Sequence, residues 1–110
     1  MALDPNQIAS DMIGRAGAIA GKTWQTIQSS VKIELTGLAH RLVLIVEAVA
    51  TGELTAAEAQ SHFATMKFHV IATIAMATVV TEAAISQIVN AAIGAVKTAV
   101  NSAAGFSLIA

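Results

Sequence analysis

The sequence predicts an all-α fold: an antiparallel hairpin of two long helices that completes a four-helix or larger bundle by oligomerisation. Three observations support this prediction. Apolar residues recur at intervals of three and four on both sides of one clear break at Gly52. Hydrophobic residues make up 55% of the 110 residues, whereas charged residues make up only 12%. The only proline is Pro5, so no other proline interrupts the two periodic segments.

The first helix is predicted over residues 6–50. Pro5 lies just before it, where a helix accepts proline because the first amide groups have no partner within the helix. The apolar residues of this segment fall on one face at about 100° per residue. They are Ile27, Val31, Leu35, Leu38, Leu42, Ile45 and Val49. We expect this face to pack against the second helix.

The turn between the helices is predicted over residues 51–54, and the second helix over residues 55–104. Gly52 supplies a C-terminal stop for the first helix, because glycine adopts the left-handed conformation that often ends a helix. Thr55, followed three residues later by Glu58, matches the capping-box pattern that starts a helix. These two signals mark the clearest helix boundary in the chain.

The second helix is predicted to end at Gly105, and an apolar tail occupies residues 105–110. The apolar stripe of this helix consists of Phe63, Val70, Ile74, Ala77, Ile85, Ile88, Ala92, Val96 and Val100. Two amphipathic helices joined by a short turn are expected to fold back on each other. We therefore expect a single helical-hairpin domain over residues 1–110.

Apolar side chains outside the two stripes predict contacts with further chains. In the middle of the second helix such side chains surround the helix, and a helix that is apolar on all sides is normally buried on all sides. The side chains assigned to an oligomer interface are Ile33, Leu44, Met76, Val79 and Val80. Since a lone pair of helices cannot cover them, we expect a homo-oligomer.

Three charged residues lie at or within the apolar stripes. Glu34 and Arg41 fall at the edge of the first stripe, and Lys67 falls within the second, close to them in the hairpin register. We predict that they form one buried polar layer. Such a layer fixes register and partner number in coiled coils, usually without adding stability. The alternative role, an ion or proton path, would need more than one layer.

Histidine and glutamate residues are the candidate metal ligands. Glu58 and His62 are four residues apart on one helix face, and His69 follows two turns later; His40 and Glu47 lie nearby in the hairpin register. Two-helix relatives of ferritin that build a di-iron centre by dimerising carry Glu-x-x-His, whereas the spacing here is Glu-x-x-x-His. We therefore expect solvated or interface histidines and no cofactor. For the same reason we do not expect His40 or His69 to ligate haem.

Several classes of function are disfavoured by composition. The chain has no cysteine or tyrosine, no glycine-rich phosphate loop and no nucleophile elbow, which argues against an enzyme. A net charge of −1, with six basic and seven acidic residues, gives no electrostatic footprint for nucleic acid. The N-terminal sequence MALDPNQIASDM lacks the apolar segment of a signal peptide, so a cytoplasmic or virion-associated location is expected.

The first functional hypothesis, based on the excess of apolar residues, is a non-enzymatic structural protein that self-assembles. It would be a subunit of a homo-oligomer, filament or virion-like particle. The alternative is a membrane-inserting or pore-forming protein. Charges are sparse from Phe68 onward, but a spanning segment of residues 68–96 would place Glu82 in the hydrocarbon at about 2.5 kcal/mol or more. A small metal-binding or haem-binding bundle is the third hypothesis. The sequence gives no small-molecule ligand.

Overall fold

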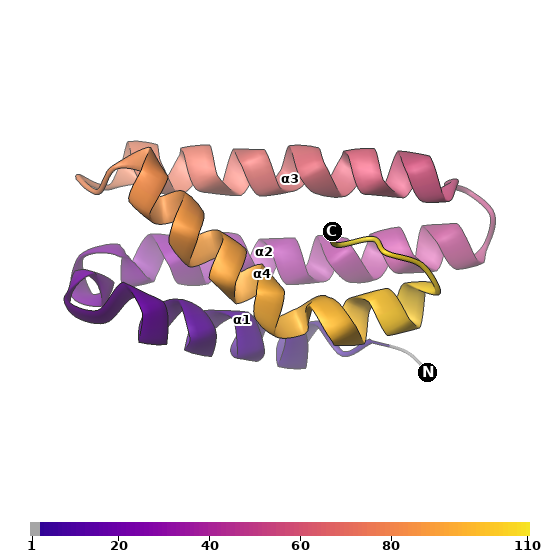
Figure 1. Ribbon diagram of the computed structural model, residues 1–110, viewed down its shortest axis with the longest axis horizontal. Helices are drawn as coiled ribbons and strands as arrows, with labels where there is room; N and C mark the ends of the chain where they lie inside the picture. The colour runs from indigo at the N-terminus through magenta and orange to yellow at the C-terminus, as the bar shows by residue number, and fades with distance from the viewer. Residues whose placement is uncertain (1–2) are drawn as a thin grey trace.

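The computed structural model describes residues 3–110 and confirms the all-α class (Figure 1). Within this range there are four α-helices, one short 3-10 helix and no strands. In chain order they are α1 (Pro5–Ala20), η1 (Gly21–Thr23), α2 (Trp24–Ala50), α3 (Ala56–Ala77) and α4 (Glu82–Ala104). Each predicted long helix is therefore two helices, and the chain forms a four-helix bundle by itself.

The predicted first helix is broken at the 3-10 turn η1. Helix α1 ends at Gly21, whose φ of 57° is a conformation that glycine adopts without steric cost. Its amide still donates to the carbonyl of Gly17. After the turn, the Trp24 ring packs on Gly17, where a Cβ atom would lie 3.4 Å from the indole. The chain thus reverses direction where the apolar period alone predicted a continuous helix.

The predicted second helix is broken at residues 78–81, the sequence Thr-Val-Val-Thr. The Thr78 hydroxyl donates to the carbonyl of Ile74 at 3.0 Å, and Thr78 itself is extended, with φ −129° and ψ 171°. The Thr81 hydroxyl then caps α4 by accepting the amide of Ala84 at 3.3 Å. Four consecutive β-branched residues have low helix propensity, so a short extended connection replaces the helix here.

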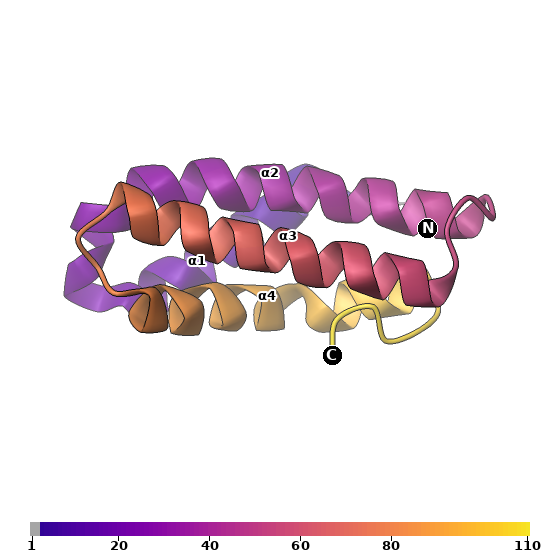
Figure 2. The same ribbon diagram turned by 90° about the horizontal axis from the view of Figure 1, so that it is seen from above.

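The four helices form an up-and-down bundle with overall dimensions of 42 × 22 × 19 Å (Figures 1 and 2). Each helix packs against the next in the chain, and α4 closes the ring by packing on α1. Helices α2 and α4 also touch across the bundle, whereas α1 and α3 are not in contact within the described residues. Both breaks lie at the end of the bundle opposite the α2–α3 turn.

The core follows the predicted apolar stripes and adds one face of α1. The stripe residues buried as predicted are Ile27, Val31, Leu35, Leu38, Leu42, Ile45, Phe63, Val70, Ile74, Ile85, Ile88, Ala92, Val96 and Val100. Val49 is half-buried and Ala77 is exposed. Helix α1 contributes Ile8, Ala9, Met12 and Ala16. The core that was expected to need a second hairpin is thus closed within one chain, and oligomerisation stays a prediction.

The turn and caps at the other end agree with the sequence. Gly52 has a φ of 79°. The Thr55 hydroxyl accepts the amide of Glu58 at 3.1 Å, and the Glu58 carboxylate accepts the amide of Thr55 at 3.0 Å. This reciprocal pair is a complete capping box at the start of α3. Local sequence signals therefore predicted this turn. The sequence signals at the two breaks at the opposite end are weaker.

Candidate functional site

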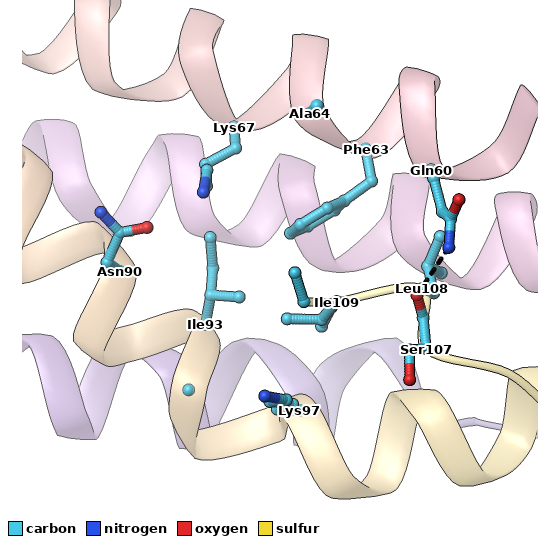
Figure 3. Close-up of a pocket in the computed structure, with 12 residues that line it drawn as sticks. Gln60, Phe63, Ala64, Lys67, Asn90, Ile93, Lys97, Ser107, Leu108 and Ile109 are labelled. Atoms are coloured by element: carbon cyan, nitrogen blue, oxygen red, sulfur yellow. Dashed lines mark hydrogen bonds between the residues drawn. The ribbon is translucent and has the colours of Figure 1, made fainter. Parts of the chain in front are cut away.

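A pocket of about 510 Å³ lies between α3, α4 and the C-terminal tail (Figure 3). Its position follows from the break at residues 78–81, which sends α4 diagonally across the bundle from the end of α3 (Figure 1). The residues that line it are Gln60, Phe63, Ala64, Lys67, Asn90, Ile93, Gly94, Lys97, Ser107, Leu108, Ile109 and Ala110. Two helices and the tail therefore form its walls.

The tail is held in place by side-chain amides on both neighbouring helices. Gly105 ends α4 with a φ of 82°, and the chain then turns back along the bundle. The Asn101 amide makes two hydrogen bonds to the backbone of Ile109, donating to its carbonyl at 2.9 Å and accepting its amide at 2.8 Å. Gln60 donates to the carbonyl of Ser107 at 3.0 Å. These three bonds fix the tail as the third wall of the pocket.

The floor of the pocket is apolar. Phe63 on α3, Ile93 on α4 and Leu108 and Ile109 on the tail are all buried, and all four also belong to the core. Figure 3 shows the Phe63 ring and the Ile109 side chain between the two helices. The sequence predicted an apolar tail, and the structure docks this tail against α3 and α4.

The rim of the pocket carries two lysines. Lys67 is half-buried and extends from α3 towards α4, while Lys97 is exposed and lies at the α4 side (Figure 3). Asn90 precedes Lys97 in α4, and its side-chain amide donates to the Ser86 hydroxyl at 3.2 Å. Among the described residues, no aspartate or glutamate side chain lines this pocket. Ala110, the last residue of the sequence, also lines the pocket, so a chain that ends there places one terminal carboxylate beside the two lysines. The side chains of the rim are thus positively charged above an apolar floor.

Small residues keep the pocket open. Ala64 faces it from α3 and Gly94 from α4. A Cβ atom built on Gly94 would meet nothing within 4 Å, so this glycine is not required by close packing. Glycine in the interior of a helix costs about 0.5–1 kcal/mol relative to alanine. Gly94 therefore leaves space that the packing of this chain does not fill.

The predicted buried polar layer is wrong. Glu34 and Lys67 are half-buried and Arg41 is exposed, and no polar or charged residue is buried anywhere in residues 3–110. The break at residues 78–81 explains part of the error, because it brings α4 alongside α3 and Lys67 lines the pocket between them. Burying a charge without a partner also costs several kcal/mol, so charged side chains at a stripe edge turn to solvent.

The candidate metal ligands are all exposed. They are His40, Glu47, Glu58, His62 and His69. Within the part of the chain that the structure describes, no group of three histidine, aspartate or glutamate side chains is placed to hold a metal ion. The structure thus does not bring these residues together as a site.

Glu58 has a structural role at the start of α3. Hydrogen bonds from the backbone amide and with the hydroxyl of Thr55 lower the pKa of this carboxyl, and the charge of His62 lowers it further by a smaller amount. The capping box needs the carboxylate as an acceptor. Glu58 and His62 also border a second hollow on the surface of α3, together with Ala57, Ser61, Thr65 and Met66.

The side chains assigned to an oligomer interface lie mostly outside the core. Met76 and Val79 are 87% and 92% exposed, and Ile33 and Leu44 are also exposed, whereas Val80 is half-buried. Two further apolar side chains that were not predicted to lie at an interface, Ile19 and Phe68, are also exposed. Both are apolar residues outside the predicted stripes, and this position in the sequence could have indicated that they are exposed.

Helix α4 is the one helix in residues 3–110 with the length and apolar composition to cross a membrane. One face of it, including Ile85, Val89 and Val96, belongs to the core of the bundle. A buried helix of a bundle core has the same composition, so this is weak evidence for a spanning helix.

No known protein family, no curated protein and no solved structure matches this chain. The function is therefore inferred from the fold and the side chains described above.

Proposed function

We propose that this chain is a non-enzymatic structural protein whose preformed four-helix bundles assemble with one another through apolar side chains outside the core. The observation that carries the proposal is the exposure of Met76 and Val79, which are 87% and 92% accessible at the end of α3 and in the connection that follows. These two residues are three positions apart, and exposed apolar side chains that lie together on a folded protein typically mark a site of interaction.

Helix α3 is apolar on two sides. Phe63, Val70 and Ile74 face the core and are buried, whereas Phe68 and Met76 are exposed. Full burial of a large apolar side chain is favourable by about 1.5–3 kcal/mol relative to exposure. Covering the outer side of α3 would therefore provide a driving force for association that the single bundle leaves unused.

The exposed apolar residues include three near one end of the bundle. Met76 and Val79 flank the end of α3, and Ile19 lies near the end of α1, where the chain turns into α2 (Figures 1 and 2). We call these three residues the apolar end. A second copy of the chain has the same surface, so two-fold pairing would bury the apolar end of both copies in one interface. This supports a homo-oligomer built from the apolar end.

Size-exclusion chromatography with light scattering tests the proposal. We expect the native chain to exceed 11.2 kDa and its mass to rise with concentration. The double variant Met76→Lys/Val79→Asp keeps the net charge and removes the apolar side chains, so its dissociation constant should rise at least about tenfold. The matched control Ala57→Asp/Ser61→Lys introduces the same charges at exposed positions near the other end of α3 and should assemble normally.

Two results would contradict self-assembly. One is a native chain that stays at the monomer mass of 11.2 kDa up to millimolar concentration. The other is equal weakening by the double variant and its control, because added charge rather than lost apolar surface would then explain the change.

A second candidate, membrane insertion, rests on the composition of α4 and on the exposed Val79 in the connection before it. Insertion would require α4 to leave the core and carry its buried face into lipid. Flotation with liposomes and dye release between about pH 5 and 7, the range in which histidine gains charge, test this candidate. Without flotation or dye release at either pH, the membrane candidate fails and self-assembly stands alone.

A further inference from the structure

We propose that the pocket between α3, α4 and the tail binds a medium-chain aliphatic carboxylate. The carboxylate would lie at the rim with Lys67 and Lys97, and the alkyl chain would lie on the floor formed by Phe63, Ile93 and Ile109. This inference is independent of self-assembly, because its residues are distinct from the apolar end.

The size and lining of the pocket match a small organic ligand. Its volume of about 510 Å³ falls within the range of about 300–1,000 Å³ that is usual for such sites, which are mostly apolar and carry a few polar groups that orient the ligand. Phe63 and Ile93 supply apolar contact from opposite helices (Figure 3). An alkyl chain therefore finds apolar surface on both sides.

The charge at the rim selects an anion. Lys67 and Lys97 line the same pocket from different helices, and no aspartate or glutamate side chain among the described residues lines it. These two positive charges exceed the single terminal carboxylate of a chain that ends at Ala110. An anion at this opening would be attracted by both ammonium groups. Long lysine stems also let each ammonium group reach a carboxylate while the methylene groups pack on apolar surface. A neutral apolar ligand would leave these charges unused.

The pocket is preformed rather than created by the ligand. Asn101 and Gln60 already hold the tail by three hydrogen bonds, so binding does not have to order this segment. Gly94 leaves open space on the opposite wall, where an added Cβ atom would have no neighbour within 4 Å. A ligand can thus enter without displacing a packed side chain.

Isothermal titration of the full chain with sodium decanoate tests the proposal. We expect saturable binding with one decanoate per chain. Butanoate, with the same head group and a short chain, should bind at least about tenfold more weakly because it loses apolar contact. Decyltrimethylammonium, with the same chain length and a positive head group, should show no saturable binding.

Variants locate the site. Lys67→Gln and Lys97→Gln should each raise the dissociation constant about three- to tenfold, since each removes a charge-assisted contact. Lys32→Gln, a change at an exposed lysine on α2, is the matched control and should leave it unchanged. Gly94→Leu should fill the pocket and abolish binding without loss of helical circular dichroism. If Gly94→Leu does not fold, Ala64→Leu fills the pocket from α3 instead.

Four results would overturn the proposal. The first is no saturable binding of decanoate to the native chain. The second is an equal effect of Lys32→Gln and Lys67→Gln, which would indicate nonspecific attraction. The third is unchanged binding in a folded variant with leucine at position 94 or 64. The fourth is loss of binding in Met76→Lys/Val79→Asp, which would place decanoate at the apolar end; unchanged binding in that variant supports the pocket.

Discussion

Gly94 and Gly105 lie near each other in sequence but have opposite structural requirements. Gly94 is inside α4, and its Cβ position is empty. Gly105 ends the same helix in the left-handed conformation, with a φ of 82°. An L-residue in that conformation costs about 1 kcal/mol or more. Substitutions at these two positions therefore separate two effects on stability: the space available for a side chain at Gly94 and the backbone conformation at Gly105.

This contrast gives a prediction for the free energy of unfolding. Gly94→Ala should increase it by about 0.5–1 kcal/mol, because alanine has higher helix propensity and meets no clash. Gly105→Ala should decrease it by about 1 kcal/mol, because of the positive φ. Urea denaturation of both variants checks the prediction, and a decrease for Gly94→Ala would show that a side chain at this position disturbs the packing.

Glu58 gives a pH dependence at the start of α3. Its pKa is lower in the folded chain because of hydrogen bonds with Thr55. A lowered pKa means that the stabilisation is fully present above the ordinary pKa of glutamate, about 4.3, and is lost as the pH falls through the lower folded value. NMR titration should therefore give a Glu58 pKa below the ordinary value of glutamate.

Thr55→Ala is the corresponding test. The amide of residue 55, whose hydrogen bond to the Glu58 carboxylate is the largest cause of the lowered pKa, remains in this variant. Loss of the hydroxyl should therefore raise the Glu58 pKa only part of the way towards its ordinary value. An unchanged pKa in Thr55→Ala would show that the threonine hydroxyl does not set it.

At the scale of the elements, the sequence predicted the turn at Gly52, the capping box at Thr55 and most of the buried stripes. It did not predict the breaks at Gly21–Thr23 and at residues 78–81. A helical period continues through such breaks, because each new helix presents its apolar face to the same core. The Thr-Val-Val-Thr break also contains no glycine or proline.

The pocket could not be predicted because it depends on these breaks. The sequence predicted Lys67 in a buried layer with Glu34 and Arg41, and nothing in it connected Lys67 with Lys97. The connection at residues 78–81 brings α4 beside α3, and the tail then closes the third side. Only the apolar character of residues 105–110 indicated that the tail would be docked.

The connection at residues 78–81 also provides a test of topology. Replacing Thr78, Val79, Val80 and Thr81 with alanine should favour a continuous α3–α4 helix, because alanine has the highest helix propensity and the Thr81 cap is lost. A continuous helix cannot fold back on its own chain, so two copies should exchange helices in a swapped dimer. Light scattering would then give twice the monomer mass.

A control distinguishes swapping from association at the apolar end, since the alanine variant also removes Val79. Adding Met76→Lys to the alanine variant should leave a swapped dimer intact, because exchanged helices are held by the core. A monomeric alanine variant with native helix content would show that these four residues do not impose the break.

At the scale of the whole molecule, the helices are not held equally. Helices α2 and α4 each contact the other three helices, whereas α1 and α3 each contact only α2 and α4. Of these two, α3 makes the less extensive contacts. The α3 helix also has the exposed Phe68 and Met76 on its outer side and the pocket along its border with α4. Its attachment therefore depends on fewer neighbours than that of α2 or α4.

This unequal attachment has a consequence for native-state fluctuations. Amide protons in α3 should exchange with solvent deuterium through a partial opening that costs less free energy than global unfolding, whereas those in the middle of α2 and α4 should require global unfolding. During such an opening, Phe63, Val70 and Ile74 would briefly lose their cover. The same helix would then be the first part of the molecule accessible to proteases and to aggregation with other copies.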